Sequence, residues 1–156
     1  ATTTWERWDS YTIEHGFGDA SMNSFNHYAY GAVAGWMFSS MAGIRYNIDN
    51  PGGKHIVFAP CPTMKVPSVN ATYESVYGLI KAKSFFEEEN WNYIVTVPAN
   101  TTATFVLPVA EGRTFTVNGK TLESLSLDTD GIKYLGVIDG NARFETVAGT
   151  FNFKRV

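Results

Sequence analysis

The sequence predicts a mainly β fold, an antiparallel β-sandwich preceded by one long helix. Short runs of alternating apolar and polar residues, separated by turn residues, fill the chain after residue 54. A helical period occurs in only one place, between about residues 24 and 42. Between these regions lies the breaker-rich stretch 47–53, which marks a domain boundary. We therefore expect one domain at residues 1–46 and a β-sandwich domain at residues 47–156.

The helical segment has the pattern of a buried helix. Asn23 or Ser24 can serve as its N-cap, and Gly43 stands where a left-handed residue commonly ends a helix. Gly31 and Gly35 each cost about 1 kcal/mol against alanine inside a helix, which indicates that another backbone approaches there. No second segment has a helical period, so we expect the helix to be part of a larger structure. The apolar residues at helical spacing are Phe25, Ala29, Ala32, Val33, Trp36 and Met37.

The second half of the chain contains the predicted strands. Residues 91–97 and 102–107 form the clearest pair, and residues 76–78 connect another two. Asn118-Gly119 predicts a tight turn. The many short strands and frequent turns favour a sandwich. The predicted strands are 54–59, 69–75, 78–86, 91–97, 102–107, 113–117, 132–137, 142–147 and 150–154.

Composition excludes several classes of partner. The net charge of -3 gives no electrostatic reason to expect nucleic acid or an anionic membrane, and no apolar run is long enough to span a bilayer. One cysteine, Cys61, excludes an internal disulfide and leaves the redox compartment open. Because the chain begins at Ala1 without a methionine, we expect a processed or excised piece.

Residues 9–22 have the composition of a loop, and loops of this length are often functional. Glu14, His15 and Asp19 are metal-ligating residue types. Their spacing, however, is not typical of zinc or calcium sites. We expect solvated or substrate-facing side chains here, with no metal ion and no cofactor.

Candidate chemistry lies near the start of the chain. Glu6 and Arg7 stand between Trp5 and Trp8, and His27 lies in an aromatic run, a combination suited to gripping and attacking a sugar ring. Each residue taken alone has an ordinary explanation. Glu6 can be a surface carboxylate, His27 a hydrogen-bonded core residue, and the aromatic residues part of a core.

The order of these motifs carries more information than any one of them. Trp5-Glu6-Arg7-Trp8-Asp9, the stretch 21–33 and Ala42-Gly43-Ile44-Arg45 closely resemble the end of the catalytic domain of bacterial α-L-rhamnosidases, glycoside hydrolase family 78. The stretches 71–75 and 95–104 resemble the C-terminal β-sandwich of those enzymes. The resemblance weakens after about Val117.

This resemblance implies an (α/α)6 barrel, whose last helix is the one in the region of His27, followed by the sandwich. The family removes terminal α-linked L-rhamnose with inversion, using one glutamate as general acid and another as general base. By motif, Glu6 falls on the general base and His27 on a residue lining the rhamnose site. Trp5, Arg7 and Trp8 flank the base and are substrate-binding candidates.

The general acid of the family lies in an earlier barrel segment. We therefore expect a C-terminal fragment of a bacterial enzyme, periplasmic or cytoplasmic, that does not hydrolyse alone and tends to self-associate. Its expected partners are rhamnose-containing glycans or glycosides and the rest of the barrel. The alternative is a non-catalytic carbohydrate-binding or structural module.

Overall fold

The computed structural model describes residues 2–45, 47 and 49–156 and divides the chain into two compact units, residues 1–36 and 37–156. Tyr46 and Ile48, at the predicted boundary of 46/47, lie outside the described residues. That boundary therefore stays a prediction. Among the described residues, no helix combines the length and apolar character needed to cross a bilayer.

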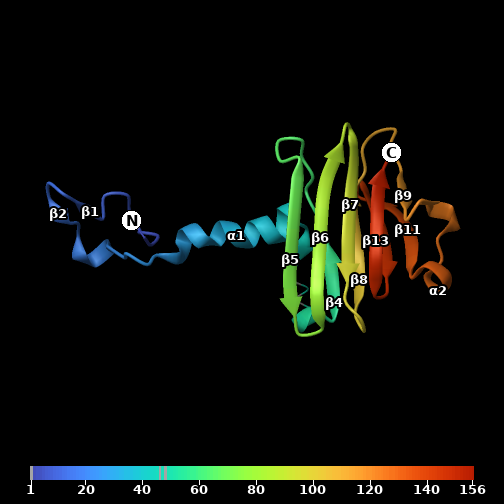
Figure 1. The fold of residues 1–156 in the computed structure, drawn as a ribbon, viewed down its shortest axis with the longest axis horizontal. Coiled ribbons are helices and arrows are strands. Elements are labelled where there is room, and N and C mark those ends of the chain that lie inside the picture. Colours follow the sequence, from blue (N-terminus) through green and yellow to red (C-terminus); the bar gives the residue numbers. More distant parts are fainter. Residues whose placement is uncertain (1, 46, 48) are drawn as a thin grey trace. The chain divides into compact units, whose positions relative to one another are not determined.

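The second unit contains a two-layered β-sandwich, which confirms the predicted fold class (Figure 1). A six-stranded sheet has the order β10-β9-β13-β7-β6-β5, and a five-stranded sheet has the order β11-β12-β8-β4-β3. The strands of the first sheet are β5 (Ser68–Ser75), β6 (Gly78–Glu87), β7 (Asn90–Val97), β9 (Phe115–Val117), β10 (Lys120–Thr121) and β13 (Gly149–Arg155). Those of the second are β3 (Ile44–Arg45), β4 (His55–Phe58), β8 (Thr102–Pro108), β11 (Ile132–Ile138) and β12 (Asn141–Thr146).

Two details of strand pairing differ from the prediction. Strands β7 and β8, expected to pair, belong to different sheets, because the connection 98–101 crosses between the layers. Strand β4 runs parallel to β8, with β5, β6 and β7 forming the crossover that parallel pairing requires. The predicted tight turn is confirmed, since Asn118 and Gly119 both have positive φ angles, 51° and 80°, between β9 and β10.

The core lies between the two sheets and is rich in aromatic rings. Phe105 contacts Phe153 with ring centroids 4.6 Å apart and stacks on Phe58 at 4.9 Å. The buried indole of Trp91 has a partner in this core, since its Nε1 donates to Ser84 Oγ at 2.7 Å. The largest fully buried side chains include Trp91, Tyr93, Phe58, Phe105, Phe115, Phe144 and Phe153.

The end of the helical stretch is anchored to this sandwich. Gly43 has a φ of 79°, which confirms the predicted left-handed residue, and a Cβ there would lie 2.5 Å from Pro60 N. The Tyr93 hydroxyl donates to the Ala42 carbonyl at 2.6 Å, and Ala59 N donates to the Gly43 carbonyl at 2.8 Å. Only glycine fits at position 43, so the chain turns tightly into β3.

The predicted long helix is shorter and less regular than expected. It consists of a 3-10 turn at Tyr28–Gly31, helix α1 at Ala32–Trp36 and a π-helical turn at Met37–Met41. The predicted N-cap at Asn23 or Ser24 is wrong, because the chain around Ser24 pairs with an earlier segment instead. Other short helical turns are Ala20–Met22, Pro51–Gly53, Leu122–Ser124 and α2 (Leu127–Asp130).

Candidate active site

The first unit brings together the two stretches that carry the predicted site residues. Glu6 N donates to the Ser24 carbonyl at 2.8 Å, and His27 N donates to the Thr4 carbonyl at 2.8 Å. Thr3 Oγ1 adds a bond to the Phe25 carbonyl at 2.5 Å. Glu6 and His27, 21 positions apart in sequence, therefore lie on adjacent backbone segments of one small unit.

The carboxylate of Glu6 is held by the backbone opposite to it. Glu6 Oε2 accepts a hydrogen bond from Ser24 N at 2.9 Å, so the same residue pair is joined through both main chain and side chain. The side chain is half-buried. A carboxylate fixed by an amide keeps one orientation, which a positioned proton acceptor needs.

The sequence analysis missed this role of Ser24, because the residue was assigned to a helix cap. Short polar residues favour both caps and local turns, so residue type alone does not separate the two. The residues around Ser24 share the helical period of the following segment, so the sequence offers no local signal for this pairing.

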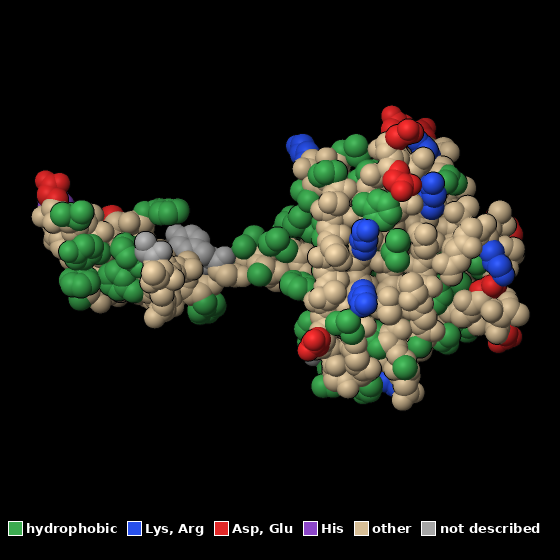
Figure 2. Space-filling view, viewed as in Figure 1, with side chains coloured by type: hydrophobic (Ala, Val, Ile, Leu, Met, Phe, Trp, Pro, Cys, Tyr) green, Lys and Arg blue, Asp and Glu red, His purple; other side chains and the backbone are tan. Residues whose placement is uncertain are grey.

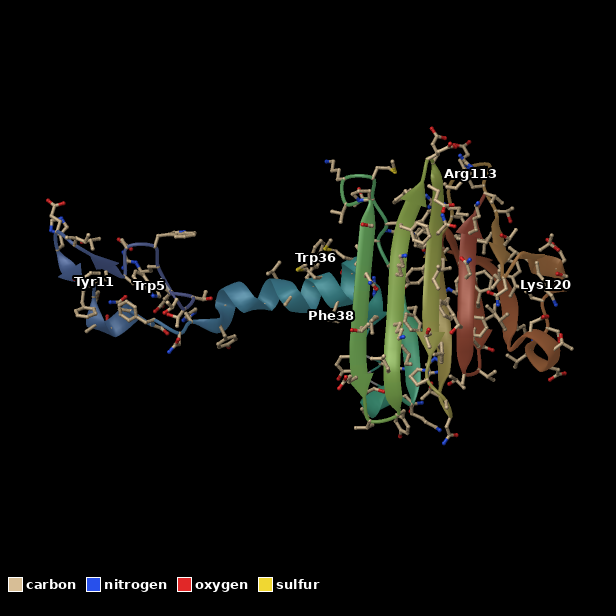
Figure 3. All side chains as sticks on the ribbon, viewed as in Figure 1. Trp5, Tyr11, Trp36, Phe38, Arg113 and Lys120 are labelled. Carbon is tan, nitrogen blue, oxygen red and sulfur yellow. The ribbon has the colours of Figure 1, made fainter. Side chains whose placement is uncertain are left out.

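Aromatic rings support the segment behind the carboxylate. Trp5 packs edge-on against Phe25 with centroids 5.0 Å apart, and Phe25 contacts Phe17 at 5.7 Å. Phe17 in turn contacts Tyr11 at 5.1 Å (Figure 3 labels Trp5 and Tyr11). Such edge-to-face pairs add to area burial and fix ring orientation. Trp5 is therefore a packing residue as well as a neighbour of Glu6.

Arg7 and Trp8, which follow Glu6 in sequence, have different surroundings. The Arg7 guanidinium forms a two-pronged contact with Asp9, with Nε to Oδ1 and Nη2 to Oδ2 both at 3.2 Å. The Trp8 side chain is 93% exposed. A large exposed indole is unusual and is the kind of surface that stacks on a ligand ring.

His27 lies just before the helical turn Tyr28–Gly31. Its imidazole stacks on the Tyr28 ring at 6.2 Å with an interplanar angle of 16°, and the residue is half-buried. The imidazole is thus neither enclosed in a helix core nor fully solvated. This arrangement leaves a histidine edge that can contact a bound molecule.

The predicted loop 9–22 is wrong in part, because it contains a small hairpin. Strands β1 (Tyr11–Thr12) and β2 (Gly16–Phe17) pair across a turn that Gly16 makes with a φ of 70°. The glycine that argued against regular structure is what permits the hairpin.

The side chains of Asp19, Glu14 and His15 in that loop make local contacts. Asp19 Oδ1 accepts from Ser21 N at 2.9 Å and from Ser21 Oγ at 2.8 Å, and the backbone bond from Ser21 lowers the pKa of Asp19. Glu14 and His15 lie 3.8 Å apart on the surface. Among the described residues, no group of three acidic, histidine or cysteine side chains is placed to hold a metal ion.

The chain thus combines a β-sandwich with a preceding segment that holds a carboxylate, and the family matches place this combination among the glycosidases. Residues 1–41 match the family described as the bacterial alpha-L-rhamnosidase 6 hairpin glycosidase domain, and residues 43–122 match the bacterial alpha-L-rhamnosidase C-terminal domain. The chain belongs to the bacterial α-L-rhamnosidase family, and the predicted relationship is confirmed.

Curated relatives agree with this assignment. An alpha-L-rhamnosidase of Formosa agariphila is 38% identical over 141 residues, which cover 86% of this chain and 15% of that protein. An alpha-L-rhamnosidase of Streptomyces avermitilis is 40% identical over 110 residues, which cover 69% of this chain and 10% of that protein. The chain thus spans a small part of the length of these relatives.

Solved structures show the same fold. The Streptomyces avermitilis alpha-L-rhamnosidase complexed with L-rhamnose matches with a TM-score of 0.73 and 32% identity, covering 97% of this chain and 13% of that one. The alpha-L-rhamnosidase from Dictyoglumus thermophilum matches with a TM-score of 0.77 and 24% identity, covering 99% of this chain and 16% of that one. The second likeness concerns the fold alone.

Proposed function

We propose that this chain is the C-terminal part of an enzyme that hydrolyses terminal α-L-rhamnosyl residues with inversion, and that Glu6 is its general base. The observation that carries this proposal is the Glu6 carboxylate held by Ser24 N at 2.9 Å within the stretch that matches the glycosidase domain. The names of the relatives supply the substrate class, since they are α-L-rhamnosidases.

In the proposed reaction, Glu6 takes a proton from a water molecule. The water oxygen then bonds to the anomeric carbon as the bond from that carbon to the leaving oxygen breaks. A second carboxylic acid gives its proton to the leaving oxygen on the opposite face of the ring. Inversion requires the two carboxyl groups to stand about 6.5 to 9.5 Å apart, with room for the water between them. We assign the acid to another part of the six-hairpin domain.

The neighbours of Glu6 have separate proposed roles. His27 lines the rhamnose site and binds the sugar, since its segment runs beside that of Glu6. The exposed Trp8 ring packs against the sugar or its aglycone. Trp5 and Arg7 lie beside the site and position this segment through Phe25 and Asp9.

The remainder of the barrel is the proposed partner of the helical stretch. Val33, Trp36, Met37 and Phe38 are between 41% and 57% exposed (Figure 3 labels Trp36 and Phe38). Figure 2 shows the apolar side chains gathered along this stretch. Exposed apolar side chains that lie close together in sequence are surface that a partner can cover. We assign residues 1–46 to the end of the barrel and residues 47–156 to the sandwich domain.

The central test is Glu6→Gln in an enzyme with a complete six-hairpin domain. The amide keeps the shape of the carboxylate and loses the proton acceptor, so kcat for an activated rhamnoside should fall about 10²- to 10⁴-fold with little change in KM. Glu14→Gln is the matched control, because it removes a carboxylate from the exposed turn of the same unit. His27→Ala should raise KM more than Glu6→Gln does.

Added azide provides a second readout. A small anion can attack from the face that the base serves, and the Glu6→Gln enzyme should then form a β-configured rhamnosyl azide. Near-normal turnover by a folded Glu6→Gln enzyme contradicts the assignment. So does a loss of activity accompanied by a loss of the circular dichroism of the folded enzyme, because then the variant reports on folding.

The 156-residue chain alone should not cleave p-nitrophenyl α-L-rhamnoside, since the proposed general acid is not among its residues. It should also self-associate through the exposed apolar stretch 33–38. Turnover by the purified chain, with contaminating enzyme excluded, contradicts the first expectation. A monomer at all concentrations in analytical ultracentrifugation contradicts the second.

A further inference from the structure

The outer face of the six-stranded sheet carries a group of residues that the catalytic proposal does not use. On β6, Ile80, Ala82 and Ser84 are buried, so the alternating Lys81 and Lys83 point to solvent. Lys154 on β13 lies on the same face. It pairs with Asn92 of β7, which pairs on its other side with Phe85 of β6. We call this surface the lysine face. Its members are Asn70, Thr72, Glu74, Lys81, Lys83, Phe85, Glu87, Ile94, Thr96, Thr150, Asn152 and Lys154.

Two of the three lysines of the lysine face, Lys81 and Lys83, have no ion-pair partner among the described residues, since neither has a carboxylate within 4.0 Å. Lys154 forms an ion pair with Glu87, whose Oε2 lies 3.8 Å from Lys154 Nζ and which stands on the same face at the end of β6. The residues directly opposite Lys81 and Lys83 are Thr72, Thr96, Asn70 and Ile94.

In the five-stranded sheet, Lys133 and Arg143 each lie near a carboxylate, as Lys154 does and as Lys81 and Lys83 do not. Lys133 stands directly opposite Glu145 in the pairing of β11 with β12, and Arg143 lies 3.8 Å from Asp139. Opposite charges across a strand pair are the usual stabilising arrangement. The chain as a whole carries a net charge of -3, so a positive face is not a reflection of composition. The lysine face carries Lys81, Lys83 and Lys154 against Glu74 and Glu87, so it has a small excess of positive charge on an acidic chain.

The geometry of this face suits an extended ligand. Lys81 and Lys83 are two residues apart on one strand, about 7 Å, and Lys154 lies two strands away, about 10 Å across the sheet. The Lys83 ammonium lies 5.0 Å from the centre of the half-buried Phe85 ring. Hydroxyl and amide groups fill the rows between, and Thr96 Oγ1 lies 3.1 Å from Thr150 Oγ1. Figure 2 shows this surface, with basic side chains over the strands and acidic ones toward their ends.

We propose that the lysine face binds a linear polysaccharide that carries carboxylate or sulfate groups. The ammonium groups pair with the anionic substituents, while the threonine and asparagine side chains exchange hydrogen bonds with sugar hydroxyls. A protein partner is disfavoured, because the centres of protein interfaces are depleted of lysine and enriched in large apolar residues. The sandwich would in this way hold the enzyme on a charged glycan. This role is independent of the assignment of Glu6.

The test is retardation of the 156-residue chain in native gels that contain polygalacturonate, dextran sulfate or neutral dextran. We expect retardation by one or both anionic polymers, which separates carboxylate from sulfate recognition, and none by neutral dextran. Raising the salt concentration should weaken binding, since exposed charges are screened. Lys81→Gln/Lys83→Gln should weaken binding about 2- to 30-fold, the range for two exposed charge pairs.

A matched control removes the same charge elsewhere. Lys65→Gln/Lys133→Gln changes two exposed lysines outside the lysine face and should retain binding. Poly-L-glutamate and single-stranded DNA serve as anionic polymers of other classes and should bind more weakly. The proposal is overturned if the two double variants lose binding equally, if all polyanions bind alike, or if no anionic polysaccharide retards the chain at low salt. Unchanged thermal unfolding of both variants establishes that the folds are intact.

Discussion

The segment 2–36 and the sandwich 37–156 are stabilised by different interactions. In the sandwich, side chains such as Trp91, Tyr93 and Phe105 are fully buried in a continuous core. In the first segment, Ser10 alone is buried among the residues whose burial the structure describes. Backbone pairing and edge-to-face rings hold that segment together, as between Trp5 and Phe25.

The two regions therefore differ in role, because the sandwich is stable by its own core and the first segment carries the proposed general base. A unit of this size without a buried core gains little from the hydrophobic effect and depends on surrounding structure for stability. The proposed base Glu6 belongs to that unit, so its geometry depends on the rest of the six-hairpin domain. The sandwich carries its own stability and fixes the end of the helical stretch through Ala42 and Gly43.

The largest expected effect comes from breaking the anchor at Gly43. Gly43→Ala places a Cβ 2.5 Å from Pro60 N in a backbone with a φ of 79°. Strain and overpacking together should lower the free energy of unfolding by about 2 to 5 kcal/mol. Denaturant unfolding followed by tryptophan fluorescence measures this change.

Gly112→Ala is the control for Gly43→Ala. Gly112 has a similar φ of 68°, but a Cβ there meets nothing within 4 Å, so its cost contains the strain without the clash. Equal losses in the two variants would mean that the contact with Pro60 contributes nothing. The anchor would then be a matter of backbone conformation alone.

A smaller effect is expected at the hydrogen bond that joins the core to this anchor. Tyr93→Phe removes the hydroxyl that donates to the Ala42 carbonyl at 2.6 Å and leaves that carbonyl unsatisfied, at a cost of about 1 to 2 kcal/mol. Tyr73→Phe, at a tyrosine that is 54% exposed, should change the unfolding free energy little. A Tyr93→Phe variant as stable as the original chain would contradict the role of this bond.

The same tyrosine predicts a dependence on pH. Burial raises the pKa of Tyr93 well above its ordinary value of 10.0. Above that value the unfolded chain loses the phenolic proton and the folded chain keeps it. Stability therefore falls as pH rises, by up to about 1.4 kcal/mol per pH unit until the folded-state pKa is reached. The Tyr93→Phe variant should have a shallower alkaline decline, and parallel curves would exclude this contribution.

Local patterns predicted the strands well and their partners in part, since β5 pairs with β6 as predicted and β7 does not pair with β8. Alternation located β6 and β7 to within one residue at each end, because one face of each is buried. Alternation carries no information on which sheet a strand joins. The connection 98–101 was therefore predicted to be a hairpin turn. In the structure this connection, with Asn100 at a φ of 63°, crosses from one sheet to the other.

The candidate site was proposed from motif order and not from residue types, and its residue roles stay predictions. Glu6 and His27 have ordinary explanations taken singly, and only their sequence context resembles a known family. The pairing of residues 4–6 with 24–27 is a tertiary interaction that overrides the helix propensity around Ser24. The helix predicted from sequence periodicity included this stretch, because periodicity carries no information on tertiary pairings that compete with helix formation.

The smallest effect is expected at Gly35, where a substitution tests whether the exposed helix packs against another element in the complete enzyme. A Cβ at Gly35 meets nothing within 4 Å in this chain, so Gly35→Ala should favour α1 and stabilise its helical state by up to about 1 kcal/mol. Far-UV circular dichroism of the 156-residue chain should show a small gain in helix. Ala34→Gly, at the adjacent exposed position, should do the reverse.

In an enzyme with a complete six-hairpin domain, the sign at Gly35 should change. If another helix packs closely against this glycine, the added methyl group pushes the two backbones apart and lowers the melting temperature of the enzyme. Ala34→Gly serves there as the control for helix propensity alone. If Gly35→Ala raises the melting temperature as it raises helicity in the isolated chain, no backbone approaches Gly35. The exposed apolar stretch would then owe its composition to something other than the barrel.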